Sequence, residues 1–189
     1  MPESSADSLI DQLRQVGSQL VLVATGGGSE AIPLLLTEPG ASAVVLEAVV
    51  PYCRQAIDQL LGGSQEAYCS DLTARRLAVA AWQRCVDLGA ATDEAVGLAV
   101  TASLRSLKPK RGQHRLFAAV HRLAGTATAS LSLKKGVRSR AEEERLAAVV
   151  SLDLLLTVAG GEPAATWGEE LQALLRPGEH VVRGISHPP

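Results

Sequence analysis

Aromatic residues are scarce in this chain, and their scarcity argues against one class of function. Phe, Trp and Tyr together account for 3% of the 189 residues. Proteins that bind single-stranded nucleic acids stack the bases on aromatic side chains, so we do not expect nucleic acid to be a partner. With few rings available, the core has to be built from Leu, Val and Ala. The length corresponds to one domain with room for an appendage.

Cysteine and histidine are also few, and they are not spaced for metal binding. Cys53, Cys69 and Cys85 form no CxxC pair, and the four histidines lie apart from them in the sequence. We therefore expect reduced thiols, no metal site and no cofactor. Long apolar runs are missing as well, since none approaches the ~18 residues needed to cross a bilayer. Without an N-terminal signal-like segment, the chain is expected to be soluble and cytoplasmic, with no membrane partner.

Acidic residues are missing from one long stretch, although the formal net charge of the whole chain is only −2. Ten Lys and Arg residues and no Asp or Glu lie between Ala95 and Ala141. A block of one sign raises the local concentration of anions and steers anionic ligands toward it. The sequence therefore favours a small anionic partner.

The hydrophobic pattern predicts a chain in which strands and helices alternate. Short apolar runs typical of buried strands occur at residues 20–24, 43–50 and 95–101. Amphipathic segments predict helices over residues 8–16, 30–36, 53–61, 71–88 and 141–159. Residues 114–123 and 126–133 flank an Ala-Gly turn and predict an antiparallel hairpin. This order predicts an α/β fold, a three-layer α/β/α arrangement with a mixed sheet.

The end of the chain has a different character. Ser139, with Glu142 three residues later, matches a capping box at the start of the last long helix. We expect residues 1–160 to form the α/β domain and residues 161–189 to be a linker-like tail with one short helix near residues 169–175. The tail is expected either to end the chain or to lead into a downstream domain.

Three segments that follow predicted strands are candidates for a binding site, because ligands of such sheets bind beyond the carboxyl ends of the strands. In the turn Gly26-Gly27-Gly28-Ser29, glycines let a ligand approach the backbone, and the next helix offers free N–H groups to an anion. Tyr52 follows the second strand, and a basic loop runs from Thr101 to His114. Each segment also has a purely structural interpretation: a tight turn, a tyrosine that anchors a helix, and a solvated loop.

These segments supply the candidate site residues. Ser29 and Tyr52 are the candidate catalytic residues, and no residue is assigned to a metal. Hydroxyl, guanidinium and ammonium groups capture phosphate or carboxylate, and glycines expose the backbone to it. The ligand-binding candidates are Thr25, Gly26, Gly27, Gly28, Thr101, Ser103, Lys108, Lys110, Arg111 and His114.

The order of these motifs resembles a known family. ATGGGSEAIPLLLTEPGAS, followed by AVVLEAVVPYCRQAIDQLLG and later GLAVT, is similar to the CinA C-terminal domain family, which includes nicotinamide-nucleotide amidohydrolases. That family reads AESCTGG, LT, PGAS, VVxYSNxxKxxLLG and AVTGxAGP in the same order. SLKPKRGQHRLFAAV and LSLKKGVRSRAEEERLAAVV resemble the CinA-like domain that precedes a cytidylyltransferase-like domain. The resemblance implies the CinA C-terminal fold and a possible homodimer.

The departures from the family pattern fall on the reactive residues. In the resemblance, Gly26 stands where the family has its nucleophilic serine, and Ile57 stands where it has its lysine. Tyr52 keeps the family tyrosine, while the Gly-rich AGPGG loop is replaced by the basic loop. Acyl transfer needs a nucleophile and a group that activates it, so the resemblance implies that amidase activity is lost.

Three hypotheses follow. In the first, the chain is a CinA-like module without amidase activity that binds a nucleotide or phosphorylated metabolite, or serves in assembly. In the second, it deamidates nicotinamide mononucleotide with Ser29 as a displaced nucleophile and Tyr52 or Lys108 as its partner. In the third, the basic block is an interaction surface for protein or nucleic acid.

Overall fold

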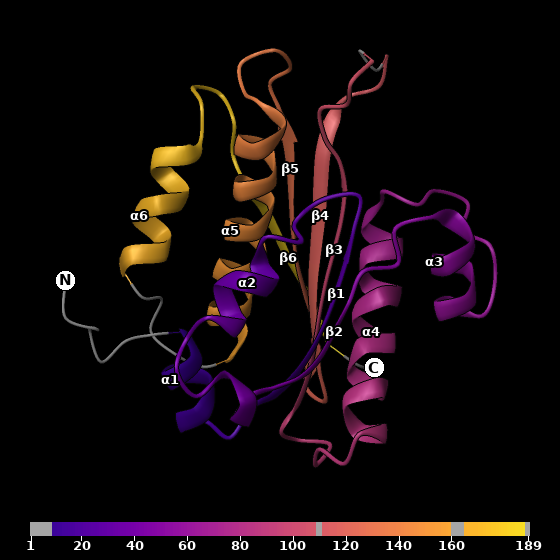
Figure 1. The fold of residues 1–189 in the computed structure, drawn as a ribbon, viewed down its shortest axis with the longest axis vertical. Helices are drawn as coiled ribbons and strands as arrows, with labels where there is room; N and C mark the ends of the chain where they lie inside the picture. Colours follow the sequence, from indigo (N-terminus) through magenta and orange to yellow (C-terminus); the bar gives the residue numbers. More distant parts are fainter. Residues whose placement is uncertain (1–8, 109–110, 160–164, 188–189) are drawn as a thin grey trace.

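A computed structural model describes residues 9–108, 111–159 and 165–187, and it contains one mixed sheet with helices on both faces (Figure 1). The strands are β1 (Gln19–Thr25), β2 (Val45–Val49), β3 (Ala95–Ser103), β4 (His114–Arg122), β5 (Gly125–Leu133) and β6 (Val182–Ser186). The helices are α1 (Leu9–Gln15), α2 (Ala31–Leu36), α3 (Arg54–Leu61), α4 (Asp71–Asp87), α5 (Arg140–Ala159) and α6 (Ala165–Leu174), with a short 3-10 turn at Ala41–Ala43.

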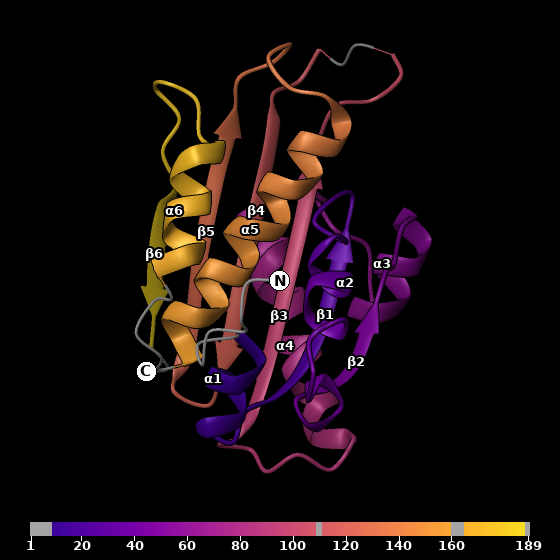
Figure 2. The same cartoon turned by 60° about the vertical axis from the view of Figure 1, so that its left-hand side comes forward.

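The sheet has the order β2-β1-β3-β4-β5-β6. Strands β2, β1 and β3 are parallel, whereas β4, β5 and β6 each run antiparallel to the preceding neighbour. Helices α3 and α4 cover one face, and α1, α2, α5 and α6 cover the other (Figures 1 and 2). The predicted three-layer α/β/α fold with a mixed sheet is confirmed.

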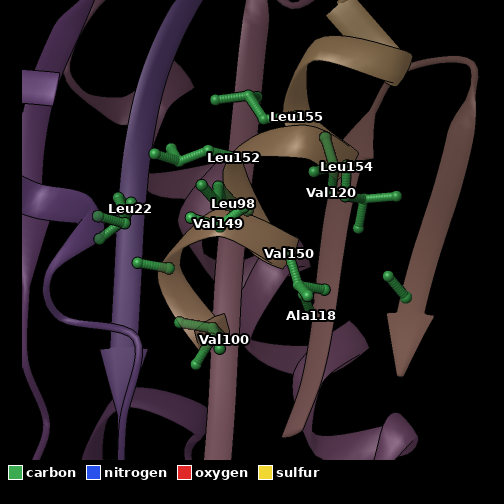
Figure 3. Close-up of a cluster of buried hydrophobic side chains, with 14 of the residues drawn as sticks. Leu22, Leu98, Val100, Ala118, Val120, Val149, Val150, Leu152, Leu154 and Leu155 are labelled. Carbon is green, nitrogen blue, oxygen red and sulfur yellow. The ribbon is translucent and has the colours of Figure 1, made fainter. Parts of the chain in front are cut away.

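The two faces of β3 explain how the layers pack. Val96, Leu98 and Val100 belong to the core cluster on the α5 side and are completely buried, and Leu98 lies near Val149 and Leu152 of that helix (Figure 3). The opposite face of β3 carries small residues instead, because α4 lies almost on the sheet there. A Cβ added to Gly97 would lie 2.0 Å from the carbonyl oxygen of Ala78 in α4.

Helix α5 is the central helix of its layer. It lies between the sheet and α6, and every residue from 146 to 156 is buried. Its start has the predicted capping box, in which Ser139 N donates to Glu142 Oε2 at 2.7 Å and Glu142 N donates to Ser139 Oγ at 3.2 Å. The capping box fixes where the first turn of α5 lies.

The C-terminal segment extends the same sheet. Strand β6 pairs with β5 over residues 182–186, and α6 packs on α5. The sequence predicted the helix but not the strand, because β6 is an edge strand whose side chains are mostly exposed and show no apolar alternation. The boundary near residue 160 lies outside the described residues and stays a prediction. Within the described ranges, no helix is both long and apolar enough to traverse a bilayer.

Candidate functional site

A cleft of about 400 Å³ lies at the carboxyl ends of β1 and β2, between the glycine turn and the start of α5. Its walls come from three segments of the chain that are far apart in sequence. The lining residues are Ala24, Gly26, Gly27, Ser29, Val50, Tyr52, Arg140, Ala141 and Glu144. This is the edge where the strand order predicts a ligand.

The glycine turn is forced by close packing on β3 and the residues after it. A Cβ on Gly26 would lie 2.0 Å from the carbonyl oxygen of Ala102, and Gly26 has a φ of +70°. A Cβ on Gly27 would lie 2.4 Å from Leu104 Cδ1. L-residues rarely adopt a positive φ, and the backbone oxygen of Ala102 cannot move aside like a side chain. The turn therefore presents bare backbone to the cleft at residues 26 and 27.

Ser29 forms a hydrogen bond with the carboxylate of Glu144, which lies on the opposite wall of the cleft. Ser29 Oγ donates to Glu144 Oε1 at 2.9 Å, and the backbone N of Glu30 approaches the same oxygen at 3.4 Å. Arg140 Nη2 lies 3.1 Å from Glu144 Oε2 and also donates to the carbonyl oxygen of Gly26 at 3.1 Å. These contacts join the glycine turn to the first turn of α5.

The electrostatics of the cleft are mixed. The positive end of the α5 dipole and the guanidinium of Arg140 favour an anion, whereas Glu144 brings one negative charge. The side chain of Arg140 is 38% exposed, so solvent and ligands can reach it. Tyr52 is 72% exposed and adds a phenol at the rim. The arrangement can therefore offer a guanidinium, a carboxylate, two hydroxyls and bare backbone to one small molecule.

Several predicted site residues have structural contacts outside this cleft. Thr25 is buried and donates to the carbonyl oxygen of Pro51 at 2.8 Å. Thr101 is buried and donates to the carbonyl oxygen of Tyr68 at 2.7 Å. Gly28 and Ser103 are not among the cleft-lining residues. Thr25 and Thr101 hold loops against strand ends, so both positions have a structural explanation.

The described residues of the basic loop likewise lie outside the cleft lining. Lys108 and Arg111 are exposed, and Lys110 falls outside the described residues. His114 is buried, with Nδ1 2.7 Å from Oε1 of the fully buried Glu143. Glu143 Oε2 also accepts a hydrogen bond from the backbone N of Arg105 at 2.6 Å. Whether any of these loop residues binds a ligand stays a prediction.

Acidic side chains from later in the chain neutralise part of the basic block. Arg138 pairs with Glu179 at 2.5 Å, with both side chains only 1% exposed, and Arg140 pairs with Glu144. Glu179 also accepts hydrogen bonds from the backbone N of Lys134 at 2.6 Å and of Arg176 at 2.8 Å. The absence of acidic neighbours in the sequence therefore does not make this block a uniformly positive surface.

The two charged residues of the cleft, Arg140 and Glu144, were not predicted from the sequence. The predicted partners of Ser29 were Tyr52 and Lys108, but its observed partner is Glu144, 115 residues away. The capping box identified the start of α5 and thus the first turn in which both residues lie. Nothing in the local sequence placed that turn over the glycine segment.

The comparisons with known proteins agree with this architecture. No protein-family model and no curated protein matches the sequence. The competence/damage inducible protein CihA from Agrobacterium tumefaciens has a TM-score of 0.63 at 19% identity, with 80% of this chain and 95% of that one covered. CinA superfamily proteins from Escherichia coli and Enterobacter cloacae have TM-scores of 0.62 and 0.63 at 17% and 15% identity. They cover 84% and 85% of this chain, and 94% and 97% of their own chains.

The chain therefore has the fold of the CinA superfamily, as the motifs predicted. The shared fold spans almost the full length of these neighbours. At this level of identity the likeness concerns the fold alone, and the site has to be argued from the residues present. The similarity to a domain that precedes a cytidylyltransferase-like domain stays a prediction.

Proposed function

We propose that this domain binds a small anionic metabolite, of the nucleotide or sugar-phosphate class, in the cleft between the glycine turn and α5, without hydrolysing it. The observation that carries the proposal is the close contact between Gly26 and Ala102. It leaves bare backbone at the position that corresponds, by the sequence resemblance, to the serine nucleophile. The N-terminus of α5 and the guanidinium of Arg140 supply the attraction for an anion.

The other groups of the cleft support binding rather than amide hydrolysis. Among the described residues that line the cleft, none is Lys or His, the usual proton acceptors beside a nucleophile. Tyr52 is largely exposed, and the carboxylate beside Ser29 is also paired with Arg140. These groups therefore suit ligand binding better than acyl transfer.

Calorimetric titration tests the proposal. Nicotinamide mononucleotide, nicotinic acid mononucleotide and ribose 5-phosphate are titrated into the protein and into an Arg140→Gln variant. We expect heat from at least one of the three and a loss of about tenfold in affinity in the variant, since one charge-assisted contact is removed. Arg84→Gln is the matched control, because Arg84 is also partly exposed and bound to a carboxylate but lies on α4. No heat with all three ligands would overturn the proposal.

A second candidate function rests on the hydrogen bond between Ser29 and Glu144. In this case Ser29 Oγ attacks the carboxamide carbon of a nicotinamide nucleotide, and Glu144 takes the hydroxyl proton and returns it to the departing ammonia. Water then releases the acid from the acyl-enzyme. Ammonia release from nicotinamide mononucleotide measures this activity directly. Activity that disappears in both Ser29→Ala and Glu144→Gln would favour this candidate, and activity unchanged in Ser29→Ala would exclude Ser29 as the nucleophile.

A further inference from the structure

The cleft contains a carboxylate oxygen, Glu144 Oε2, that receives no hydrogen bond from the described residues. Glu144 Oε1 accepts from Ser29 Oγ and from the backbone N of Glu30. Glu144 Oε2 is also buried, yet among the residues that the structure describes no donor forms a hydrogen bond with it. A buried acceptor without a hydrogen bond costs free energy, which a donor group on a ligand would recover.

The charge partner of that oxygen, Arg140, lies at ion-pair distance but does not form a hydrogen bond with it. Arg140 Nη2 lies 3.1 Å from Glu144 Oε2, but without hydrogen-bond geometry, and it donates to the carbonyl oxygen of Gly26. A guanidinium has five N–H donors, so these contacts leave others for an anion. An anion that draws Arg140 toward itself would leave Oε2 facing the cleft with its negative charge uncompensated.

Resting on the proposed function, we propose that the cleft selects ligands in which an anionic group and a hydrogen-bond donor lie a few bonds apart. Arg140 takes the anion, and Glu144 Oε2 takes the donor, which is best a positively charged amine. Ser29 fixes the carboxylate through Oε1. A ligand with a second anion in place of the donor is disfavoured, because the two negative groups would meet in a partly desolvated site.

Three small phosphates test this selectivity, because they differ only in the group that would meet Glu144 Oε2. Ethyl phosphate, phosphoethanolamine and phosphoglycolate share a phosphate and differ at the far end, which carries a methyl group, an ammonium group or a carboxylate. Their dissociation constants are obtained from amide shifts in a ¹H–¹⁵N NMR titration of the full chain. We expect phosphoethanolamine to bind about tenfold tighter than ethyl phosphate, the size of one charge-assisted hydrogen bond, and phosphoglycolate to bind weakest.

A Glu144→Gln variant tests the assignment to this residue. Glutamine keeps the length and helix preference of glutamate and removes the charge, so the order of the three phosphates should change. Phosphoethanolamine should lose its advantage, and phosphoglycolate should no longer be the weakest. Glu170→Gln is the matched control, because Glu170 also binds an arginine of α5, Arg145 at 2.7 Å, but does not line the cleft. It should leave the order unchanged.

The outcomes distinguish this inference from the function on which it rests. Equal affinities for the three phosphates, or an order that Glu144→Gln does not change, would overturn the selectivity and leave anion binding intact. Titrations without any shift would also overturn it. In that case, heat from a nucleotide in the calorimetric experiment would still support the proposed function, and its absence would remove both.

Discussion

The backbone of Gly26 lies against Ala102 so closely that a Cβ on Gly26 would sit 2.0 Å from the Ala102 carbonyl oxygen. The turn and the strand beside it therefore accept only glycine at this position. In the sequence resemblance this is the position of the family serine, and the packing against Ala102 leaves no room for a serine side chain at residue 26.

We expect Gly26→Ser to destabilise the protein by more than about 2 kcal/mol and to generate no amidase activity. The positive φ alone costs about 1–2 kcal/mol, and the clash with a backbone oxygen adds to it. Gly62→Ser is the matched control, because Gly62 has a φ of +71° and no heavy atom of the described residues within 4 Å of a built Cβ. Urea denaturation measures both variants, and equal losses would show that the contact with Ala102 is unimportant.

The buried pair of Arg138 and Glu179 should be a major source of stability for the C-terminal segment. Arg138 donates to Glu179 and to the carbonyl oxygen of Leu174 at 2.6 Å. Arg138→Met leaves a buried carboxylate without its cation, so we expect a loss of about 3–5 kcal/mol. The double variant Arg138→Met with Glu179→Leu should lose less, since no charge is then stranded. Arg84→Met, which breaks an exposed pair, should change the unfolding midpoint little.

The stability of the protein should fall as the pH drops from about 5 to about 2. Burial would raise the pKa of Glu179, but hydrogen bonds from Arg138 and from the backbone N of Lys134 and Arg176 outweigh it and lower the pKa to about 2. The unfolded chain takes up the proton near the ordinary value of 4.5, so acid favours unfolding by about 3 kcal/mol over this window. The contribution is fully present above pH 5.

Denaturation curves across this pH range measure the effect. The Glu179→Gln variant lacks the titrating group, so it should be less stable at neutral pH and lose less stability on acidification. An identical pH dependence in the parent protein and the variant would show that Glu179 is not responsible.

The cysteines should differ in reactivity. Burial raises the pKa of the Cys85 thiol, which donates to the carbonyl oxygen of Gln19 at 3.1 Å, whereas Cys53 is exposed. Because the thiolate is the reactive form, a disulfide reagent at about pH 8 should modify Cys53 within minutes and Cys85 only on unfolding. Cys53→Ser should remove the fast phase, and a fast phase that persists in this variant would contradict the expected difference.

The order of helices and strands was predictable because it depends on local periodicity. The runs around Leu22 and Leu98 and the capping box at Ser139 are visible within a few residues of sequence. Strand β6 was not predictable in this way, since an exposed edge strand buries too little to show an apolar pattern. Its place comes from pairing with β5, which is a tertiary interaction.

Only one wall of the candidate cleft was predicted from the sequence. The glycine turn and Tyr52 follow strands and could be placed at the cleft from topology. The opposite wall, with Arg140 and Glu144, depends on how the β4–β5 hairpin returns the chain to α5. His114 shows the same limit, because its position in a basic loop suggested anion binding, while the fold buries it against Glu143.

The contact between Arg138 and Glu179 also concerns the cleft, because Arg138 lies two residues before Arg140. The ion pair between Arg138 and Glu179 therefore connects the C-terminal segment to the start of α5, which lines the cleft. Releasing Glu179, by proteolysis or by force, would remove a contact that holds the start of α5. The affinity for the proposed anionic ligand should then fall. By thermodynamic reciprocity, a bound ligand would in turn hold the C-terminal segment in place.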